Sequence, residues 1–299
     1  MSAAEHTTVL RGEWREHEPL ARYTSWQIGG PADRLYVPAD ADDLAAVLAS
    51  LPAEEPVFWL GLGSNLLIRD GGIRGTVIST RQALGGLEAP GRGRVYAGAG
   101  VACAKAARFC TRNGLVGAEF LAGIPGTIGG ALAMNAGAWG GETWPYVEAV
   151  ATVDRNGVQR ERPREDYRVG YRAVEGPGDE WFTGARFVFE EGDGGAARER
   201  IRALLEERAR SQPTGTKSCG SVFRNPAGDH AARLIESAGL KGTSIGGAAV
   251  SEKHANFILN RGDARAADVE ALIERIRAEV ERRFGVRLQQ EVRIVGEAA

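Results

Sequence analysis

The chain has few cysteines and histidines for its 299 residues, three of the former and four of the latter. The cysteines, Cys103, Cys110 and Cys219, are odd in number and show no CxxC spacing, and the sequence contains no HExxH motif. We therefore expect neither a disulfide scaffold nor a metal site. The first 18 residues are charged and lack an apolar core, which argues against a signal peptide. Free thiols and a cytoplasmic location are expected.

No run of about 20 apolar residues occurs, so no segment is expected to span a membrane. The net charge is only −2, and most arginines lie in segments that also carry glutamate. A nucleic-acid-binding surface needs a clustered cationic excess, so no nucleic-acid partner is expected. With 43% apolar and 25% charged residues, the composition is that of a globular protein. The length suits two or three domains.

Strand-like and helix-like segments alternate along the chain, which predicts the α+β or α/β class. Strands are expected at 34–38, 57–65, 75–80, 94–100, 185–191, 255–260 and 291–296, and helices at 40–51, 101–114, 196–212, 230–240 and 268–285. Asp40 or Asp42 is expected near the N-cap of the first helix. The segment 147–162 predicts a β-hairpin with a type I′ turn at Asn156-Gly157.

The two long C-terminal helices differ in their apolar pattern. In 196–212 the apolar side is expected to consist of Ile201, Leu204 and Leu205, and a domain boundary is placed at the start of this helix. In 268–285 the apolar residues keep i, i+3, i+4 spacing, which predicts a helix that faces the core.

Glycine is abundant, with 41 residues, and is concentrated in a few loops. The loop 61–72, "GLGSNLLIRDGG", follows an expected strand and offers successive backbone N–H groups beside Ser64 and Asn65. Such an arrangement suits a phosphate. The loop matches neither the Walker motif nor the Rossmann fingerprint, and a plain strand-to-strand turn explains it equally well.

The segment 122–142, "AGIPGTIGGALAMNAGAWGGE", has seven glycines among 21 residues and few polar side chains. Glycine allows a backbone to approach another group closely. An aromatic cofactor with a diphosphate tail, lying against this backbone and the first loop, would explain the composition. A close-packed junction between domains would explain it as well.

Several motifs occur in a fixed order between about Tyr23 and Gly296. They are "TSWQIGGPADRLYVP", "GLGSNLLIRDGGIRGTVI", "LAGIPGTIGGALAMNAGAWGGE", "YRVGYR", "GSVFRNP", "AARLIESAGLKGTSIGGAAVSEKHANFILN" and "LQQEVRIVG". Together they resemble the UDP-N-acetylenolpyruvoylglucosamine reductase family, the flavoenzymes that complete UDP-N-acetylmuramate for peptidoglycan. The resemblance covers nearly the whole chain.

The resemblance implies an α+β chain with a two-part FAD-binding fold of the vanillyl-alcohol-oxidase type and a C-terminal α+β domain. The parts are expected at 1–80 and 81–195 for FAD and at 196–299 for the UDP-sugar. No histidine lies in the glycine-rich loops, so FAD is expected to be non-covalent. The expected FAD contacts are Gly61, Gly63, Ser64, Asn65, Leu66, Ile124, Pro125, Gly126, Thr127, Gly129, Gly130, Asn135 and Gly137.

The same resemblance implies the reaction. NADPH reduces FAD and leaves, and UDP-N-acetylglucosamine enolpyruvate takes its place. Its methylene carbon then receives hydride from flavin N5, and the adjacent carbon is protonated. The expected partners are these small molecules alone, and a monomer is expected.

Three catalytic residues of the family fall on Ser221 of "GSVFRNP", Arg172 of "VGYR" and Glu291 of "EVRIVG". The residue types suit the implied roles. A guanidinium stabilises the charge that builds up on the substrate carboxylate, and a well-placed hydroxyl, that of Ser221, can protonate a basic carbon. Glu291 would either orient the donor or share a proton with the intermediate, and the sequence leaves both roles open.

The remaining family positions concern substrate binding. Expected contacts are Tyr171, Arg224, Asn225, Lys253 and Arg293. The chain departs from the family pattern after Arg172 and at Arg265, and it resembles the compact subtype without a tyrosine-bearing closing loop. Which residue closes the site is left open.

Three other functions fit the sequence less well. A hydrolase using Ser221 would need a nearby base, and the G-x-S-x-G motif is absent. A flavin oxidase would pass electrons to oxygen and would need no UDP-sugar domain. A non-catalytic nucleotide-sugar sensor would be marked by loss of Ser221, Arg172 or Glu291, and all three are present.

Overall fold

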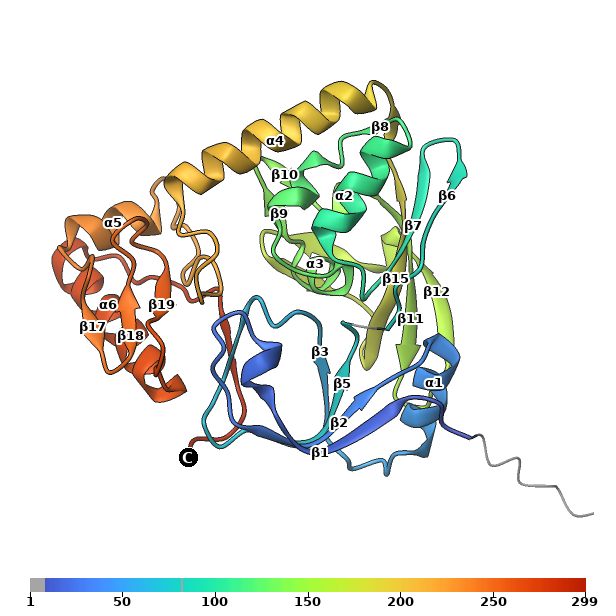
Figure 1. The fold of residues 1–299 in the computed structure, drawn as a ribbon, viewed down its shortest axis with the longest axis horizontal. Helices are drawn as coiled ribbons and strands as arrows, with labels where there is room; N and C mark the ends of the chain where they lie inside the picture. Colours follow the sequence, from blue (N-terminus) through green and yellow to red (C-terminus); the bar gives the residue numbers. More distant parts are fainter. Residues whose placement is uncertain (1–8, 82) are drawn as a thin grey trace, which may run out of the picture.

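Two separate sheets occupy the first two-thirds of the chain, and a smaller unit of helices and short strands follows (Figure 1). The structure, a computed structural model, describes residues 9–81 and 83–299. Within these ranges no helix is both long and apolar enough to cross a membrane.

The first sheet has four strands in the order β1-β2-β5-β3. Their bounds are Glu13–Pro19 for β1, Pro31–Val37 for β2, Val57–Leu60 for β3 and Ile73–Ser79 for β5. Helix α1 (Ala41–Ser50) begins after Asp40, whose side chain accepts a hydrogen bond from the Asp43 N–H at 2.9 Å. Leu44 and Val47 of α1 pack against Tyr36 and Ile78 of the sheet. The predicted helix and its Asp40 N-cap are confirmed.

The second sheet is antiparallel, with the order β12-β11-β15-β7-β6. Its strands are β6 (Leu87–Gly91), β7 (Arg94–Gly98), β11 (Val147–Asp154), β12 (Gln159–Pro163) and β15 (Glu180–Val188). Helix α3 (Ile128–Met134) contacts β7 and β15, and α2 (Cys103–Arg112) packs between η2 (Glu119–Gly123) and α4 (Gly194–Ser211). Cys103 and Cys110 both face the core, as the sequence predicts, and burial raises the pKa of each to about 12.

The hairpin of β11 and β12 is present, but its turn differs from the prediction. A type I′ turn needs positive φ at both central residues. Here only Gly157 has positive φ, at 77°, and its N–H donates to the Asp154 carbonyl at 3.0 Å. The Asp154 carboxylate also accepts from the N–H groups of Asn156 and Val158. The predicted type I′ turn is therefore wrong, because the aspartate side chain stabilises a longer turn.

Helix α4 carries a narrower apolar side than predicted. Ile201 is buried in the core of the second sheet, whereas Leu205 is 40% exposed. The prediction that Leu205 faces the core is wrong, because Ala197 and Ile201, one turn apart, are the residues of α4 that are buried. Since Ile201 packs with the second unit, α4 is continuous with that core. The predicted division at residues 80 and 195 stays a prediction.

The third unit contains α5 (Ala231–Ser237), α6 (Ala266–Phe284) and a small antiparallel sheet, β17-β18-β19. The strands are β17 (Ser244–Ile245), β18 (Ala248–Val250) and β19 (Ile258–Asn260). The predicted apolar stripe of α6 is confirmed, with Val269, Leu272, Ile273, Ile276 and Val280 all buried. The strand predicted from residue 255 begins later, because the Phe257 N–H donates to His254 in a turn.

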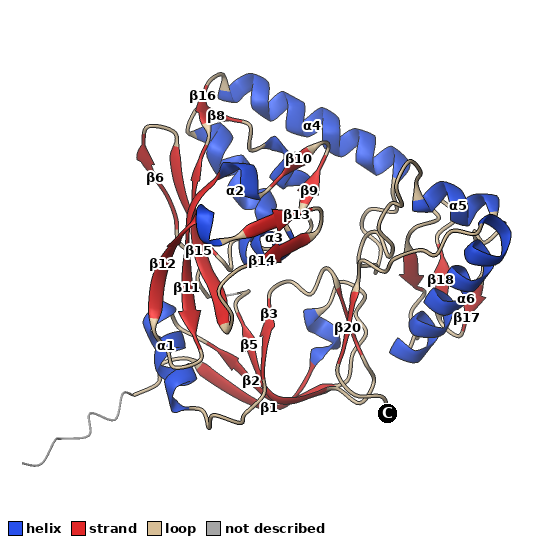
Figure 2. Cartoon of the chain, turned by 180° about the vertical axis from the view of Figure 1, so that it is seen from behind, coloured by secondary structure: helices blue, strands red, loops and turns tan. Residues whose placement is uncertain are grey.

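The chain finally returns to the first unit. Strand β20 (Arg293–Val295) pairs in parallel with β4 (Leu66–Ile68), which follows the first glycine-rich loop. Figure 2 shows β20 beside the first sheet and away from α5 and α6. The remaining short elements are η1 (Leu20–Tyr23), β8 (Leu115–Val116), β9 (Gly137–Ala138), β10 (Gly141–Glu142), η3 (Trp144–Tyr146), η4 (Arg164–Asp166), β13 (Arg168–Gly170), β14 (Ala173–Glu175) and β16 (Glu190–Glu191).

Candidate active site

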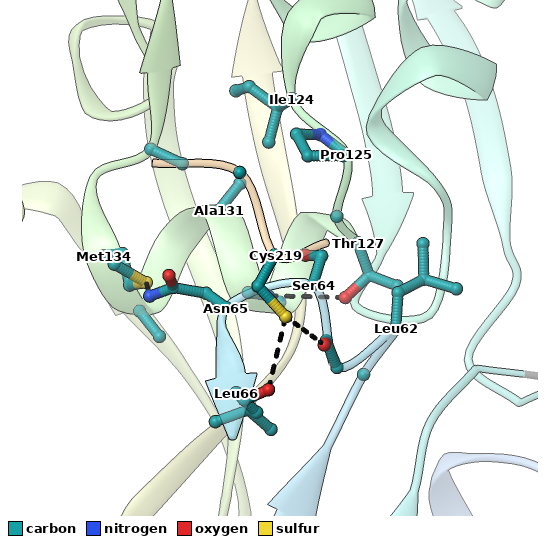
Figure 3. A pocket seen from close by; sticks show the side chains of 18 of the residues that line it. Leu62, Ser64, Asn65, Leu66, Ile124, Pro125, Thr127, Ala131, Met134 and Cys219 are labelled. Atoms are coloured by element: carbon teal, nitrogen blue, oxygen red, sulfur yellow. Dashed lines mark hydrogen bonds between the residues drawn. The ribbon is translucent and has the colours of Figure 1, made fainter. Parts of the chain in front are cut away.

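A cavity of about 590 Å³ lies where the three units meet. Its walls come from the loop 61–66, from the segment 123–139 and from separate residues of the third unit (Figure 3). Of the expected FAD contacts, all except Asn135 line this cavity. Ser221, Arg172, Glu291 and Arg293 line it as well.

The loop 61–65 presents unpaired backbone donors. Within the described residues, the N–H groups of 62–65 donate no hydrogen bond to a backbone carbonyl. Gly63 has φ of 58°, and a Cβ there would lie 2.2 Å from the Tyr23 carbonyl oxygen. A Cβ on Gly61 would lie 2.7 Å from Thr127 Oγ1. Successive backbone N–H groups without a backbone partner fit a phosphate or diphosphate.

The glycines of the segment 123–139 serve two purposes. A Cβ on Gly129 would lie 2.9 Å from Ala99 Cβ, and one on Gly137 would lie 2.3 Å from the Gly141 carbonyl oxygen, so both allow backbone packing. Gly126 and Gly130 lie at the cavity, where a Cβ would have no neighbour closer than 3.3 Å and 3.7 Å. Some glycines of this segment therefore allow close packing within the second unit, and others leave room at the cavity.

Asn135 is buried behind the cavity wall. It ends α3 with φ of 43°, and its amide donates to Glu142 Oε2 at 2.8 Å and to the Gly170 carbonyl at 3.2 Å. Its Oδ1 accepts from the Trp144 N–H at 3.1 Å. With every polar atom of the side chain engaged, the predicted contact of Asn135 with the cofactor has no support in this geometry.

Arg172 lies at the tip of the β13–β14 hairpin with φ of 53°, a backbone conformation that costs energy for a residue other than glycine. Its guanidinium donates to the carbonyls of Asn135 and Gly137 and to Glu291 Oε1, each at 3.2 Å. The neighbouring Tyr171 lies with its ring 5.0 Å from the guanidinium carbon but does not line the cavity. The strained turn therefore directs the Arg172 side chain into the cavity.

Glu291 precedes β20 and forms an ion pair with Arg172 in which both side chains are less than one-fifth exposed. Burial raises the pKa of Glu291, and the charge of Arg172 offsets part of that rise. The backbone carbonyl of Glu291 accepts from Asn65 Nδ2 at 3.1 Å, so the backbone at Glu291 is directly connected to the first glycine-rich loop. Glu291 therefore suits a role in holding a proton.

Ser221 lies in the third unit between Gly220 and Val222 and faces the cavity with Cys219. The Val222 carbonyl accepts from the Glu291 N–H at 2.8 Å, so Ser221 and Glu291 belong to adjacent backbone segments. The structure thus brings together the three residues predicted to be catalytic.

Four of the five predicted substrate contacts do not line the cavity, namely Tyr171, Arg224, Asn225 and Lys253. Arg224 donates to the Arg172 carbonyl at 3.3 Å, and its Nε is buried without a partner. Asn225 accepts from the Ala231 N–H at 3.1 Å and so caps α5. Lys253 is exposed and donates to the Ala209 carbonyl.

Two features of the cavity are not predicted by the sequence. The rings of Trp59 and Trp181 stack at 5.4 Å between centroids, and both line the cavity. Arg208 of α4 donates to the Gly123 carbonyl at 2.7 Å, and burial lowers its pKa. Trp59 lies in an apolar run typical of a core strand, and Arg208 lies among the charges of an apparently solvated helix. Neither carries a local signal.

Comparisons with known proteins agree with this geometry. A family model described as FAD binding domain matches residues 32–161. A second, described as UDP-N-acetylenolpyruvoylglucosamine reductase, C-terminal domain, matches residues 212–295. The second match begins directly after α4.

Relatives match over the full length. The UDP-N-acetylenolpyruvoylglucosamine reductase of Alkalilimnicola ehrlichii is 62% identical, covering 100% of this chain and 99% of that protein. That of Methylococcus capsulatus is 61% identical, covering 99% of this chain and 98% of that protein. The crystal structure of the reductase from Thermus caldophilus is 33% identical, with a TM-score of 0.82, and covers 96% of this chain and all of that one.

These matches confirm the predicted fold class, an FAD-binding part followed by a C-terminal α+β domain, and they confirm FAD as the cofactor. The free N–H groups of 62–65 and the open glycines at the cavity are consistent with that cofactor. The chain belongs to the UDP-N-acetylenolpyruvoylglucosamine reductase family and is an FAD-dependent oxidoreductase.

Proposed function

We propose that this enzyme reduces UDP-N-acetylglucosamine enolpyruvate to UDP-N-acetylmuramate in peptidoglycan synthesis, with NADPH as the electron donor. One observation carries the proposal: Ser221, Arg172 and Glu291 meet at one cavity whose other walls are the two glycine-rich segments. Each of the three comes from a different region of the sequence, so their convergence is not a result of local sequence.

FAD, when bound, supplies the hydride that NADPH provides and that the methylene carbon of the substrate accepts. Loop 61–65 would hold the diphosphate of the cofactor through its free N–H groups. The segment 123–139 would hold the flavin ring against an apolar backbone surface.

Arg172 would bind the carboxylate of the enolpyruvyl group. Hydride addition to the double bond places negative charge on that carboxylate and on the adjacent carbon. A guanidinium held by two backbone carbonyls and by Glu291 needs no rearrangement to stabilise this charge. Ser221 would then donate its hydroxyl proton to the adjacent carbon, which completes the addition of one hydride and one proton.

Glu291 would replace the proton that Ser221 gives away. A buried carboxyl group with a raised pKa holds its proton at a higher pH than an exposed one. The alternative, in which Glu291 only orients the donor as a carboxylate, predicts the opposite dependence on pH. We also propose that the enzyme acts as a monomer, because a single chain supplies Ser221, Arg172, Glu291 and both glycine-rich segments, so no second copy is needed to complete this set.

The test is an anaerobic pair of half-reactions followed by the visible absorbance of the flavin. NADPH is added first, then UDP-N-acetylglucosamine enolpyruvate. Bleaching by NADPH and return of colour on addition of the substrate are expected. If only oxygen restores the colour, the enzyme is an oxidase. If NADPH does not bleach the bound flavin, a sensor role replaces the proposal.

A further inference from the structure

Ser221 begins a short segment, residues 221–224, which we call the serine segment. One edge of this segment pairs with the residues before β20. The Arg224 N–H donates to the Gln289 carbonyl and the Glu291 N–H donates to the Val222 carbonyl, each at 2.8 Å. Phe223 and Gln290 form an antiparallel bridge. This edge fixes Ser221 relative to Glu291.

The remaining backbone polar groups of residues 222 and 223 form hydrogen bonds with Asn256. These bonds take the place that a second neighbouring strand could fill. The Val222 N–H donates to the Asn256 carbonyl at 2.9 Å. The Phe223 N–H donates to Asn256 Oδ1 at 3.0 Å, and Asn256 Nδ2 donates to the Phe223 carbonyl at 2.8 Å. A carboxamide offers one donor and one acceptor in the same plane, so a single side chain satisfies both polar groups of Phe223.

These contacts are buried. Asn256 is 3% exposed and Phe223 is 1% exposed, so water cannot replace the amide. Asn256 does not line the cavity, whereas its neighbour Phe257 does. Two residues before the serine segment, the Cys219 thiol donates to the carbonyls of Leu66 at 3.3 Å and Gly63 at 3.6 Å (Figure 3). Ser221 therefore lies between a contact with the cofactor loop and the Asn256 contact.

We propose that Asn256 is a positioning residue for proton transfer, which holds the serine segment so that the Ser221 hydroxyl reaches the substrate. The inference rests on the proposed function, because it assigns Asn256 a part in the step that Ser221 performs. Asn256 touches neither the substrate nor the reacting atoms. It acts only through the backbone of residues 222 and 223.

Asn256→Ala removes both side-chain contacts, so the Phe223 N–H and carbonyl are left buried without partners. Because an unsatisfied buried polar group costs free energy, we expect the serine segment to move. A displacement of about 1 Å in a reacting group can cost about 10²-fold in rate. We expect Asn256→Ala to slow flavin reoxidation by the enolpyruvyl substrate by about that factor. Reduction by NADPH does not involve Ser221 and should keep its rate. The solvent deuterium isotope effect on reoxidation should rise.

Asn256→Asp gives a second signature. A protonated aspartic acid can donate to the Phe223 carbonyl as the amide does, whereas an ionised one can only accept. The ratio of the reoxidation rates of Asn256→Asp and the wild type should therefore rise as the pH is lowered. His254, Lys253 and Glu291 are the same in both proteins, so the ratio removes their contribution. The corresponding ratio for Asn256→Ala should stay flat.

Asn260→Ala is the matched control. Asn260 is also buried, and it donates to the Trp26 carbonyl at 2.9 Å and accepts from Gly262 and Ala264. Its loss removes a similar set of hydrogen bonds without touching residues 222 and 223. Both half-reactions should stay near the wild-type rates.

FAD content and thermal unfolding are measured for every variant. The proposal is overturned if Asn256→Ala reoxidises at the wild-type rate, or if both half-reactions fall equally in Asn256→Ala and Asn256→Asp at every pH. Wild-type enzyme that is not reoxidised by the substrate would instead defeat the proposed function. The two failures are therefore distinguishable.

Discussion

The two halves of the cavity are built in different ways. The wall assigned to the cofactor consists mainly of backbone from two continuous segments, 61–66 and 123–139. The wall opposite consists of side chains from separate elements: Arg172 on a hairpin, Ser221 in a loop of the third unit, and Glu291 ahead of β20. The first wall can be recognised in the sequence because its two segments are rich in glycine. The second wall forms only when segments that are distant in the sequence come together in the fold.

This difference predicts different responses to substitution. On the backbone wall a side chain can only obstruct, so glycine is required where a Cβ would meet another atom. On the side-chain wall each residue is proposed to supply a specific charge or proton, so substitution should change the rate without preventing binding of FAD.

The largest effect is expected for Ser221→Ala. Loss of a general acid typically costs about 10²- to 10⁴-fold. Reoxidation by the enolpyruvyl substrate should slow by this factor, while reduction by NADPH and FAD content stay normal. Ser211→Ala, at the exposed end of α4, is the control and should change neither rate. Equal slowing of both half-reactions would remove Ser221 from the protonation step.

A smaller effect is expected for Arg172→Lys. Lysine keeps the charge but cannot reach two carbonyls and a carboxylate in one plane as the guanidinium does. Reoxidation should fall by about 10²-fold, as for loss of one preorganised donor. Arg168→Lys on the same hairpin is the control, because the Arg168 side chain is 88% exposed. Stopped-flow absorbance measures both, and an unchanged rate for Arg172→Lys would contradict its assigned role.

The third prediction concerns pH. Burial raises the pKa of Glu291, so its proton is retained at low pH and lost as the pH rises through that raised value. If Glu291 supplies the proton, reoxidation should fall by about tenfold per pH unit above it. Glu291→Gln should be slower and should lack this dependence. A rate that instead rises with pH would assign Glu291 the orienting role.

The smallest effect concerns the backbone wall. Gly63→Ala introduces a Cβ at positive φ and within 2.2 Å of a carbonyl oxygen, whereas Gly140→Ala has positive φ and no neighbour within 4 Å. The positive φ alone costs about 1–2 kcal/mol. Gly63→Ala should lose more unfolding free energy than Gly140→Ala and should retain less FAD after gel filtration. Equal losses would mean that the close approach at Gly63 is unimportant.

The sequence predicted features that depend on neighbours along the chain. The N-cap at Asp40 and the buried stripe of α6 follow from local spacing, and the glycine-rich segments follow from composition. The residues proposed to be catalytic follow from the order of the family motifs, since Arg172 or Glu291 alone carries no local sign of function.

The rest depends on contacts that no local pattern encodes. The stack of Trp59 on Trp181 needs the relative position of two sheets. Leu205 is exposed because burial on α4 is confined to Ala197 and Ile201, which spacing within the helix does not reveal. The turn at Gly157 depends on hydrogen bonds to the Asp154 side chain that compete with the expected type I′ geometry.

The pairing of β20 with β4 has a mechanical consequence. The third unit leaves the second unit after α4 and returns to the first unit through β20. It also shares a core with the first unit, because Trp26, Ile28 and Leu67 are buried among the apolar residues of α5 and α6. Asp70 accepts from the N–H groups of Ala266 and Ala267 at the start of α6, and Arg69 forms an ion pair with Glu270. Moving the third unit away from the first would expose this apolar surface to water, so the two units are expected to move as one piece.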